Sequence, residues 1–273
     1  MKHQTKAIYK FCHKTFIYFP NFILFMVWFS EISFKRVERL IEEAYDAIYI
    51  PANVHNKLVQ MFDSLPFAFK IQGKKVCLGI LEKNLPLKEY YSIYSINIWH
   101  HEKLTKHVEE NHKRLKKAIK DKSHPFHAEL MSKIGSNYYR YELLLIANLF
   151  HDIGIPSTQI IKTHGKYGRI VISKNHDKAG RMIIEEIRDQ IYKLFDFDSK
   201  EYEYILNFPE AHTYLLYKRF SEDEKLQADV GLSEDDLKNI REAKEKYEEY
   251  FNKHSADFYF FAEHDRGRKD KER

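Results

Sequence analysis

A mainly α-helical fold is predicted by this 273-residue sequence, on three observations. Apolar residues recur at helical spacing in several long segments, and segments with the alternating pattern of a strand are short. Apolar residues make up 44% of the chain and charged residues 31%, as in globular proteins with a hydrophobic core. Segment 141–150 (YELLLIANLF) is apolar on almost every side, which is typical of a helix buried within a bundle. We therefore expect a helical bundle with a small N-terminal α or α+β head.

The chain is expected to divide into an apolar N-terminal extension (1–29), a small N-terminal region (30–97) and a larger helical domain (98–273). The extension has lysines before an apolar stretch, as a secretory signal does, but it contains Pro20 and lacks a small-residue cleavage site. It is also short for a membrane span, which needs about 20 apolar residues. Membrane contact is not expected, the alternative being an amphipathic element at a membrane surface. Met1 and Met26 are the two alternatives for the natural start, and N-terminal sequencing of the native protein would decide between them.

In the N-terminal region, apolar residues recur at helical spacing over 34–48, with Ser30 or Ser33 as the expected N-cap. A second helix is predicted over 54–62. Segment 67–81 is rich in β-forming residues around a Gly-Lys turn, which predicts a hairpin.

The larger domain is expected to begin with a basic helix over 101–122, where eight Lys or Arg stand against four Asp or Glu. An amphipathic helix is predicted over 181–195, and a charged helical excursion over 221–246. A last helix is predicted over 254–264, where its aromatic residues face the core.

Two titratable residues stand together where the buried apolar segment ends. His151 and Asp152 follow Phe150 directly, and Gly154 marks a turn. Removing an imidazole and a carboxylate from water is costly unless they are paired or bind a cation. Adjacent nitrogen and oxygen ligands suit Mn, Fe, Co, Ni, Zn or Mg better than a soft metal. The alternative is that His151 caps the helix C-terminus, where the macrodipole favours a cation, and Asp152 starts the turn.

Taken with later motifs, residues 123–270 resemble the HD-domain superfamily of metal-dependent phosphohydrolases. The signature of that superfamily is an isolated His, a His-Asp pair and a distal Asp, and His151-Asp152-Ile153-Gly154 looks like the central pair of its HDIG type. The segments NHDKAG and FAEHDRGR are similar to parts of the HD domains attached to bacterial CCA-adding enzymes and their poly(A) polymerase relatives. The resemblance implies a helical HD-domain bundle.

The resemblance also implies a set of metal ligands. His151 and Asp152 would be the central pair, and Asp265, in FAEHDRGR, would be the distal carboxylate. His176, in NHDKAG, and His212, in FPEAH, would be further ligands. The expected cofactor is one divalent metal ion, or two with Asp152 bridging them, among Mn, Ni, Co, Fe, Mg and Zn.

The first histidine of the signature has several candidates. His127 is preferred because it precedes His151 by one helix and one turn, the separation found in the CCA-adding type. The alternatives are His101, His107 and His112 on the predicted basic helix, since many HD proteins place this ligand on an earlier helix. His107 and His112 are five residues apart and therefore share a helix face poorly.

The activity implied is divalent-metal-dependent hydrolysis of a phosphomonoester or phosphodiester. Asp152, Lys178 and Arg181 are the expected catalytic residues, the last two offsetting phosphate charge at a helix start. The expected substrate is a nucleotide, a 2′,3′-cyclic nucleotide or an RNA end, with a signalling dinucleotide or alarmone as the enzymatic alternative. The basic helix 101–122 is expected to contact RNA. A non-catalytic RNA-binding or regulatory module on an HD scaffold is the alternative function.

One position departs from the family pattern. HDIG proteins usually carry Lys after the Gly, and here the residue is Ile155. A phosphate-contacting cation expected there is missing, which favours the non-catalytic alternative. Four basic residues downstream are candidates to replace it: Lys162, Lys166, Arg169 and Lys174.

Several classes of protein are not expected. The two cysteines, Cys12 and Cys77, provide neither a disulfide framework nor a CxxC zinc site, so the cytoplasm is the expected compartment. No Walker lysine motif, GxGxxG or GxSxG is found, nor the paired aspartates of a nucleotidyltransferase. The net charge of +5 permits an anionic partner without requiring one.

Overall fold

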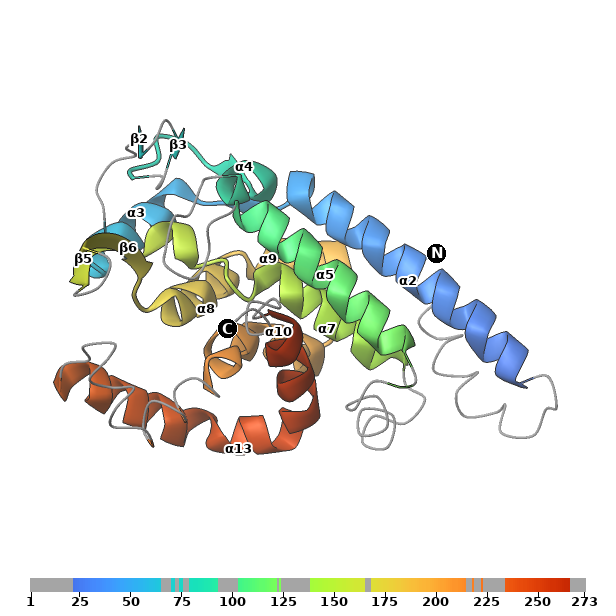
Figure 1. The fold of residues 1–273 in the computed structure, drawn as a ribbon. Coiled ribbons are helices and arrows are strands. Elements are labelled where there is room, and N and C mark those ends of the chain that lie inside the picture. The colour runs from blue at the N-terminus through green and yellow to red at the C-terminus, as the bar shows by residue number, and fades with distance from the viewer. Residues whose placement is uncertain are drawn as a thin grey trace.

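The computed structural model describes residues 22–64, 70–71, 74–75, 79–92, 103–121, 123, 138–164, 168–214, 218, 222 and 234–265. Over this part of the chain the fold is mainly α-helical, and the strands form only two-stranded sheets (Figure 1), which confirms the predicted fold class.

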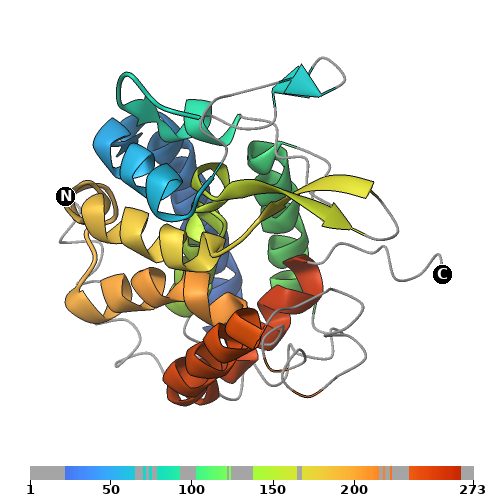
Figure 2. The same ribbon diagram turned by 90° about the vertical axis from the view of Figure 1, so that its left-hand side faces the viewer.

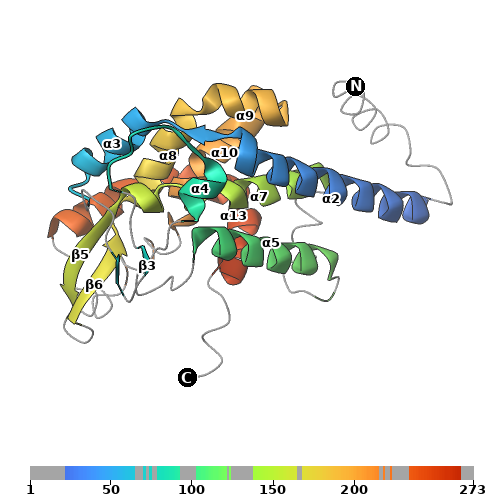
Figure 3. The same ribbon diagram turned by 90° about the horizontal axis from the view of Figure 1, so that it is seen from above.

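Helix α7 (Tyr138–Phe150) lies in the middle of the bundle. Every residue from Leu144 to Phe150 is buried, as the apolar pattern predicts. Helices α2 (Phe22–Ala47), α5 (Leu104–Lys120) and α10 (Ser199–His212) all pack against α7. Seen from above, α2 and α5 run in roughly the same direction (Figure 3). The end of α7 is therefore surrounded by other helices.

Helix α2 begins at Phe22, well before the predicted start at Phe34. The prediction that Ser30 or Ser33 caps this helix is wrong, since both lie inside it. The run before Phe34 contains neither Pro nor Gly, so nothing interrupts helix propagation there. Within the described residues, no helix combines the length and the apolarity needed to cross a bilayer. The second half of α2 buries the predicted face, which consists of Val37, Leu40, Ile41 and Ala44.

The small elements of the N-terminal region largely follow the pattern expected. Helix α3 (Ala52–Met61) confirms the predicted second helix. Strands β2 (Lys70–Ile71) and β3 (Lys74–Lys75) pair antiparallel, as a hairpin at this position requires. Residues 67–69, 72–73 and 76–78 of that hairpin lie outside the described residues, and Ile80 and Leu81, which lie within them, are not in a strand. Strand β1 (Tyr49–Ile50) pairs antiparallel with β4 (Leu85–Pro86), a contact that the sequence pattern does not indicate.

The N-terminal region contacts the segment that follows α7. Tyr91, at the end of α4 (Leu87–Tyr91), donates a hydrogen bond from its hydroxyl to the Leu149 carbonyl, at 2.6 Å. The Ser157 hydroxyl lies 2.6 Å from the Tyr90 hydroxyl and 2.8 Å from His55 Nδ1, all of them buried. One hydrophobic cluster contains residues from both sides of position 97. The expected division there falls outside the described residues and stays a prediction.

A β-hairpin follows the short 3₁₀ turn η1 (Ile155–Ser157). Strands β5 (Gln159–His164) and β6 (Gly168–Ser173) pair antiparallel, with Gln159 opposite Ser173 and His164 opposite Gly168. The hairpin extends away from the helices (Figure 2). The chain then enters α8 (His176–Glu186), so the hairpin separates the two parts of the predicted ligand set in sequence.

The amphipathic segment 181–195 buries the isoleucines expected to face the core, but it is not one helix. Helix α8 ends before Ile187, where the backbone leaves helical geometry (φ −90°, ψ 14°), and α9 (Arg188–Phe195) follows. The break redirects the chain while Ile187 itself stays buried. Periodicity alone does not reveal such a break, because the apolar spacing continues across it.

The C-terminal part closes the other side of the bundle. Helix α10 has a capping box at Asp198 and Glu201, in which each side chain accepts from the backbone N–H of the other. Helix α13 (Glu234–Asp265) is kinked at His254 (φ −119°, ψ 18°), and it packs on α5 and α10 (Figure 1). The predicted last helix, 254–264, is the part of α13 that begins at this kink.

Candidate metal centre

His151 and Asp152 lie in the turn that begins where α7 ends. The turn is closed by hydrogen bonds from Ile153 N to the Phe150 carbonyl and from Ile155 N to the Asp152 carbonyl. His151 is 0% and Asp152 is 3% exposed to solvent. An imidazole and a carboxylate in so dry a position need compensation from partners or from a cation.

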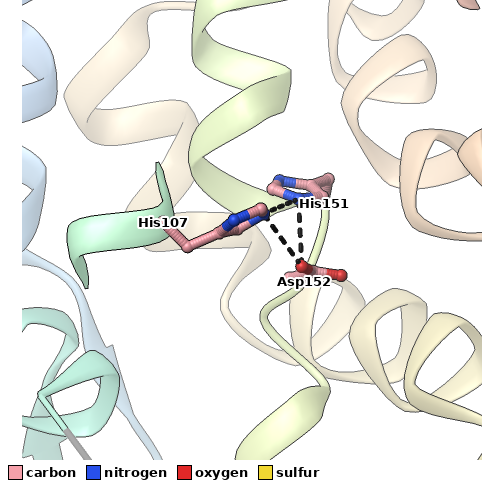
Figure 4. Close-up of side chains that lie close together, drawn as sticks. All are labelled: His107, His151 and Asp152. Atoms are coloured by element: carbon pink, nitrogen blue, oxygen red, sulfur yellow. Dashed lines mark hydrogen bonds and ion pairs between the residues drawn. The ribbon is translucent and has the colours of Figure 1, made fainter. Parts of the chain in front are cut away.

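His107 reaches the same point from α5. Its Nε2 lies 3.3 Å from His151 Nε2 and 3.5 Å from Asp152 Oδ2. His151 Nε2 is 3.0 Å from the same carboxylate oxygen. Figure 4 shows both rings directed at the Asp152 carboxylate. Two imidazole nitrogens therefore converge on Oδ2.

Two further histidines lie at the other carboxylate oxygen. His176 Nε2, from the first residue of α8, is 3.5 Å from Asp152 Oδ1. His212 Nε2, from the last residue of α10, is 3.7 Å from it. The Asp152 carboxylate is thus placed between two pairs of histidines, one pair for each of its oxygens.

Gly154 explains how α8 comes so close to the turn. A Cβ added at this position would lie 2.0 Å from the His176 carbonyl oxygen and 2.5 Å from Gly180 N. These distances are far below van der Waals contact, so only glycine allows the turn and the start of α8 to meet in this way. The close approach brings His176 to Asp152.

The orientation of two imidazole rings is set by the main chain. His151 Nδ1 is 2.8 Å from the Asn148 carbonyl oxygen, and His176 Nδ1 is 3.3 Å from that of Ser173. A carbonyl can only accept, so Nδ1 carries the proton in each neutral ring, and Nε2 keeps its lone pair for the cluster. Metal-binding histidines are commonly held in this way.

Two aromatic side chains pack beside the cluster. The ring of Phe261, on α13, is 5.0 Å from the His151 ring and 6.1 Å from the His212 ring, and it is 1% exposed. Phe208 packs on Phe261 at 5.0 Å. Low polarity strengthens electrostatic interactions between ligand atoms and a cation.

The donor atoms fit a metal ion. In each of two groups, His107 with His151 and Asp152, and Asp152 with His176 and His212, the candidate ligand atoms lie within 4.8 Å of one another. Imidazole nitrogen with carboxylate oxygen suits first-row divalent ions. These five side chains could therefore coordinate a metal ion.

The structure brings together four of the six predicted metal ligands: His151, Asp152, His176 and His212. His127 lies outside the described residues. Asp265 is the last residue of α13, and its side chain also lies outside them. In the sequence it follows Phe261 by four residues. Both predictions stay open.

Among the alternatives to His127, His107 is the histidine found in the cluster. His101 is outside the described residues. His112 is partly buried toward Glu38 of α2, and its pKa is lowered mainly by burial, against the opposing effect of Glu38. The signal for His107 was present in the sequence: it lies next to the apolar residues Leu104 and Val108 on one side of the helix, and the structure buries both of them.

The two predicted phosphate-binding cations are not joined to the cluster by any contact among the described residues. The Arg181 guanidinium hydrogen bonds to Asn207 Oδ1, and it lies 3.2 Å from Glu185 and 3.7 Å from Glu210. Burial raises the pKa of Glu210, which Lys246 and Arg181 partly offset. Lys178 is half-buried on α8. Their roles toward a substrate stay predictions.

Ile155 has a structural role in this chain. It is 2% exposed and belongs to the hydrophobic core cluster. A lysine ammonium at this position would be buried without compensation. Of the candidate replacement cations, Lys174 is exposed, and the side chains of Lys162, Lys166 and Arg169 lie outside the described part of the chain.

No protein-family model matches the chain, and neither a curated protein nor a solved structure matches it.

Proposed function

We propose that this chain is a divalent-metal-dependent phosphohydrolase of the HD-domain superfamily, acting on a nucleotide, a 2′,3′-cyclic nucleotide or an RNA end. The proposal rests on the buried histidine and aspartate cluster together with the ordered motifs of the sequence. The cluster is compatible with a metal-dependent hydrolase.

One observation carries the proposal: each oxygen of a single buried carboxylate faces its own pair of imidazoles. Asp152 Oδ2 lies 3.5 and 3.0 Å from His107 and His151, and Oδ1 lies 3.5 and 3.7 Å from His176 and His212. A purely structural histidine pair needs no second pair on the opposite oxygen. A carboxylate shared by two metal ions needs a pair of ligands at each of its oxygens, because each ion needs further ligands.

The residues of the centre have separate proposed roles. His107 and His151 would hold one ion with Asp152, and His176 and His212 would hold a second. Metal ions in such a centre make water a nucleophile near neutral pH and neutralise charge on a phosphoryl group. Asp265 follows Phe261 by one helical turn and is the proposed distal ligand. Phe261 excludes water from the His151 side of the centre.

The start of α8 is the proposed contact for the phosphate group. The N-cap residue Asn175 has left-handed backbone geometry (φ 60°, ψ 28°) and makes no capping hydrogen bond with its side chain. The N–H groups and the dipole at this end favour an anion, and His176 places them beside the centre. Lys178, in the first turn, adds positive charge.

The outer face of α5 is the proposed contact for the rest of an RNA substrate. Lys113 and Lys117 are exposed there, on the helix whose inner face carries His107, and Lys103 is exposed directly before the helix begins. Contacts of this kind neutralise phosphates without reading sequence, so they would extend an RNA site without defining its specificity.

The test is hydrolysis by metal-free protein to which Mn, Co, Ni or Mg is returned, with a 2′,3′-cyclic nucleotide, nucleoside monophosphates and a cyclic-phosphate RNA as substrates. We expect one or two ions per chain and metal-dependent turnover of at least one substrate. Asp152→Asn should abolish both, since it keeps the shape of the side chain and removes its charge. Asp189→Asn is the matched control, because Asp189 is exposed on α9. Unchanged turnover in Asp152→Asn would refute the proposal.

The same experiment separates the alternative function. A non-catalytic RNA-binding or regulatory module on this scaffold would fold without stoichiometric metal and bind RNA in a salt-dependent way. Protein that retains no metal, hydrolyses no phosphoester and still shifts RNA would favour that alternative.

A further inference from the structure

Two buried asparagines connect α5, which carries His107, with α7, which ends directly before His151. Asn111 Nδ2, on α5, donates to Asn148 Oδ1, on α7, at 2.7 Å. Asn148 Nδ2 donates in turn to the Val108 carbonyl oxygen, at 3.1 Å. Both side chains are 0% exposed. The two helices are therefore joined by consecutive amide hydrogen bonds inside the hydrophobic core.

This pair is an unusual choice for a helix contact. The neighbouring positions on the side away from the metal centre are apolar: Leu115 and Leu144 are 0% and 1% exposed. Leucines in place of the two amides would pack the helices together without the need to satisfy polar groups. A buried amide pair fixes the register of the two helices, because its hydrogen bonds form at one relative position of the helices only. Leucines do not fix the register in this way. Buried asparagines fix helix register in this way in coiled coils.

The pair stands directly beside the metal centre. Asn111 lies one helical turn beyond His107. Val108, whose carbonyl accepts from Asn148, directly follows His107. Asn148 is three residues before His151, and its own carbonyl accepts from His151 Nδ1 at 2.8 Å. The side chain of Asn148 thus holds α5, and its main chain holds the His151 ring.

We propose that Asn111 and Asn148 are positioning residues, which fix the register of α5 against α7 so that His107 and His151 meet at one oxygen of Asp152. The inference rests on the proposed function, since it assigns these residues to the metal centre of that function. Slipping α5 along α7 would move His107 away from its place 3.3 Å from His151 Nε2. His176 and His212 are held by α8 and α10 and do not depend on this register.

The test compares Asn111→Leu/Asn148→Leu with a control, Leu115→Met/Leu144→Met. The control changes buried residues on the same two helices and removes no hydrogen bond. Both double variants are expected to fold with unfolding midpoints close to that of the wild type. The amide–amide hydrogen bond loses both of its partners together, and the Val108 carbonyl, which loses the Asn148 donor, still accepts the helical hydrogen bond within α5. Asn111→Ser is a milder second variant that decides the matter if the double leucine variant does not fold.

The first readout uses metal-free protein with isotope-labelled histidine. Imidazole NMR spectra of the wild type and the control should show the His107–His151 ring contact and the Nδ1-protonated form of His151. The leucine variant should lose the contact. If it keeps the contact and the same ring signals, the two asparagines do not position the histidines and the inference is wrong.

The second readout is titration with Mn²⁺ or Co²⁺. The leucine variant should bind the ion of the His107 half about 10- to 100-fold more weakly, the loss that is usual for residues that orient metal ligands. Binding at the His176 half should be unchanged. Equal affinity for both ions in the variant and the wild type would overturn the inference. If the wild type binds no metal, the proposed function fails, and the NMR spectra of the metal-free protein alone decide the positioning role.

Discussion

The two halves of the candidate metal centre share Asp152 but differ in how they are held. In the first half, the His107 and His151 side chains are 4% and 0% exposed. His107 comes from α5 and His151 from the turn directly after α7, and these two helices are joined in the core by Asn111 and Asn148. In the second half, the side chains of His176 and His212 are 24% and 8% exposed. They come from the first residue of α8 and the last residue of α10.

The difference indicates separate tasks for the two halves. A dry site with fixed ligands holds an ion tightly and leaves little room for water or substrate. A half built from helix ends and partly open to solvent can accept a phosphate and release a product. We therefore expect the first half to retain its ion and the second half to exchange it.

The largest expected effect comes from the residue that both halves share. Asp152→Asn should lose the ions of both halves together and reduce turnover by about a thousandfold or more, because every proposed ligand pair contacts its carboxylate. Elemental analysis and initial rates measure the two losses. Loss of one ion only would show that the halves do not share this residue.

Gly154→Ala should damage the second half more than the first. The added methyl would meet the His176 carbonyl oxygen at 2.0 Å, so α8 must shift away from the turn. We expect a loss of about 3 kcal/mol in the free energy of unfolding, measured with urea, together with weaker binding of the exchangeable ion. Gly180→Ala is the matched control, because its nearest contact is a milder 3.1 Å to Pro209. Equal losses in the two variants would argue against a special role for the approach at Gly154.

His107→Ala and His176→Ala should separate the halves. His107→Ala removes a ligand of the buried half and should let a chelator extract the slowly released ion at least about tenfold faster. His176→Ala should weaken only the quickly released ion. The extraction rates, followed with a chromogenic chelator, would contradict the comparison if both variants affected the same ion.

The smallest effect on the centre is expected for Glu142, a buried acid on α7 that has no contact with the cluster among the described residues. Burial raises its pKa to about 7, against the opposing effect of Arg36. The folded protein therefore holds a proton that the unfolded chain releases, so stability is present below pH 4.5 and lost as the pH rises through about 7. The wild type should lose about 1 to 3 kcal/mol across this range.

Glu142→Gln should remove most of that pH dependence and leave the metal content unchanged. Urea unfolding at several pH values measures the pH dependence of stability, and elemental analysis measures the metal content. A change in metal content would mean that a buried acid outside the cluster affects metal binding. The difference between the two halves could then not be assigned to the ligands of each half alone.

The sequence predicts much of the bundle because its strongest patterns are local. The apolar segment that forms α7 is buried all round, and the adjacent His151 and Asp152 end it as expected. The motif segments also place His176 and His212 correctly as partners of Asp152. These results depend on helical spacing and on residue types, both of which can be read from a single chain.

Other features depend on contacts between distant residues. The hairpin of β5 and β6 has a sequence signal, since its strands contain Ile160, Ile161, Val171 and Ile172 around glycines. The hairpin is not predicted because this segment is interpreted only as the connection between the HDIG and NHDKAG motifs. The approach of α8 to Gly154 has no local signal at all. His107 could have been identified by asking which histidine shares the buried stripe of its helix.

The most direct test of the shared carboxylate is electron paramagnetic resonance of the protein loaded with Mn²⁺. Two ions bridged by Asp152 should give a spin-coupled spectrum at two Mn per chain, and Asp152→Asn should abolish it. Spectra of isolated Mn²⁺ at every loading, or a coupled signal that survives in Asp152→Asn, would contradict the account.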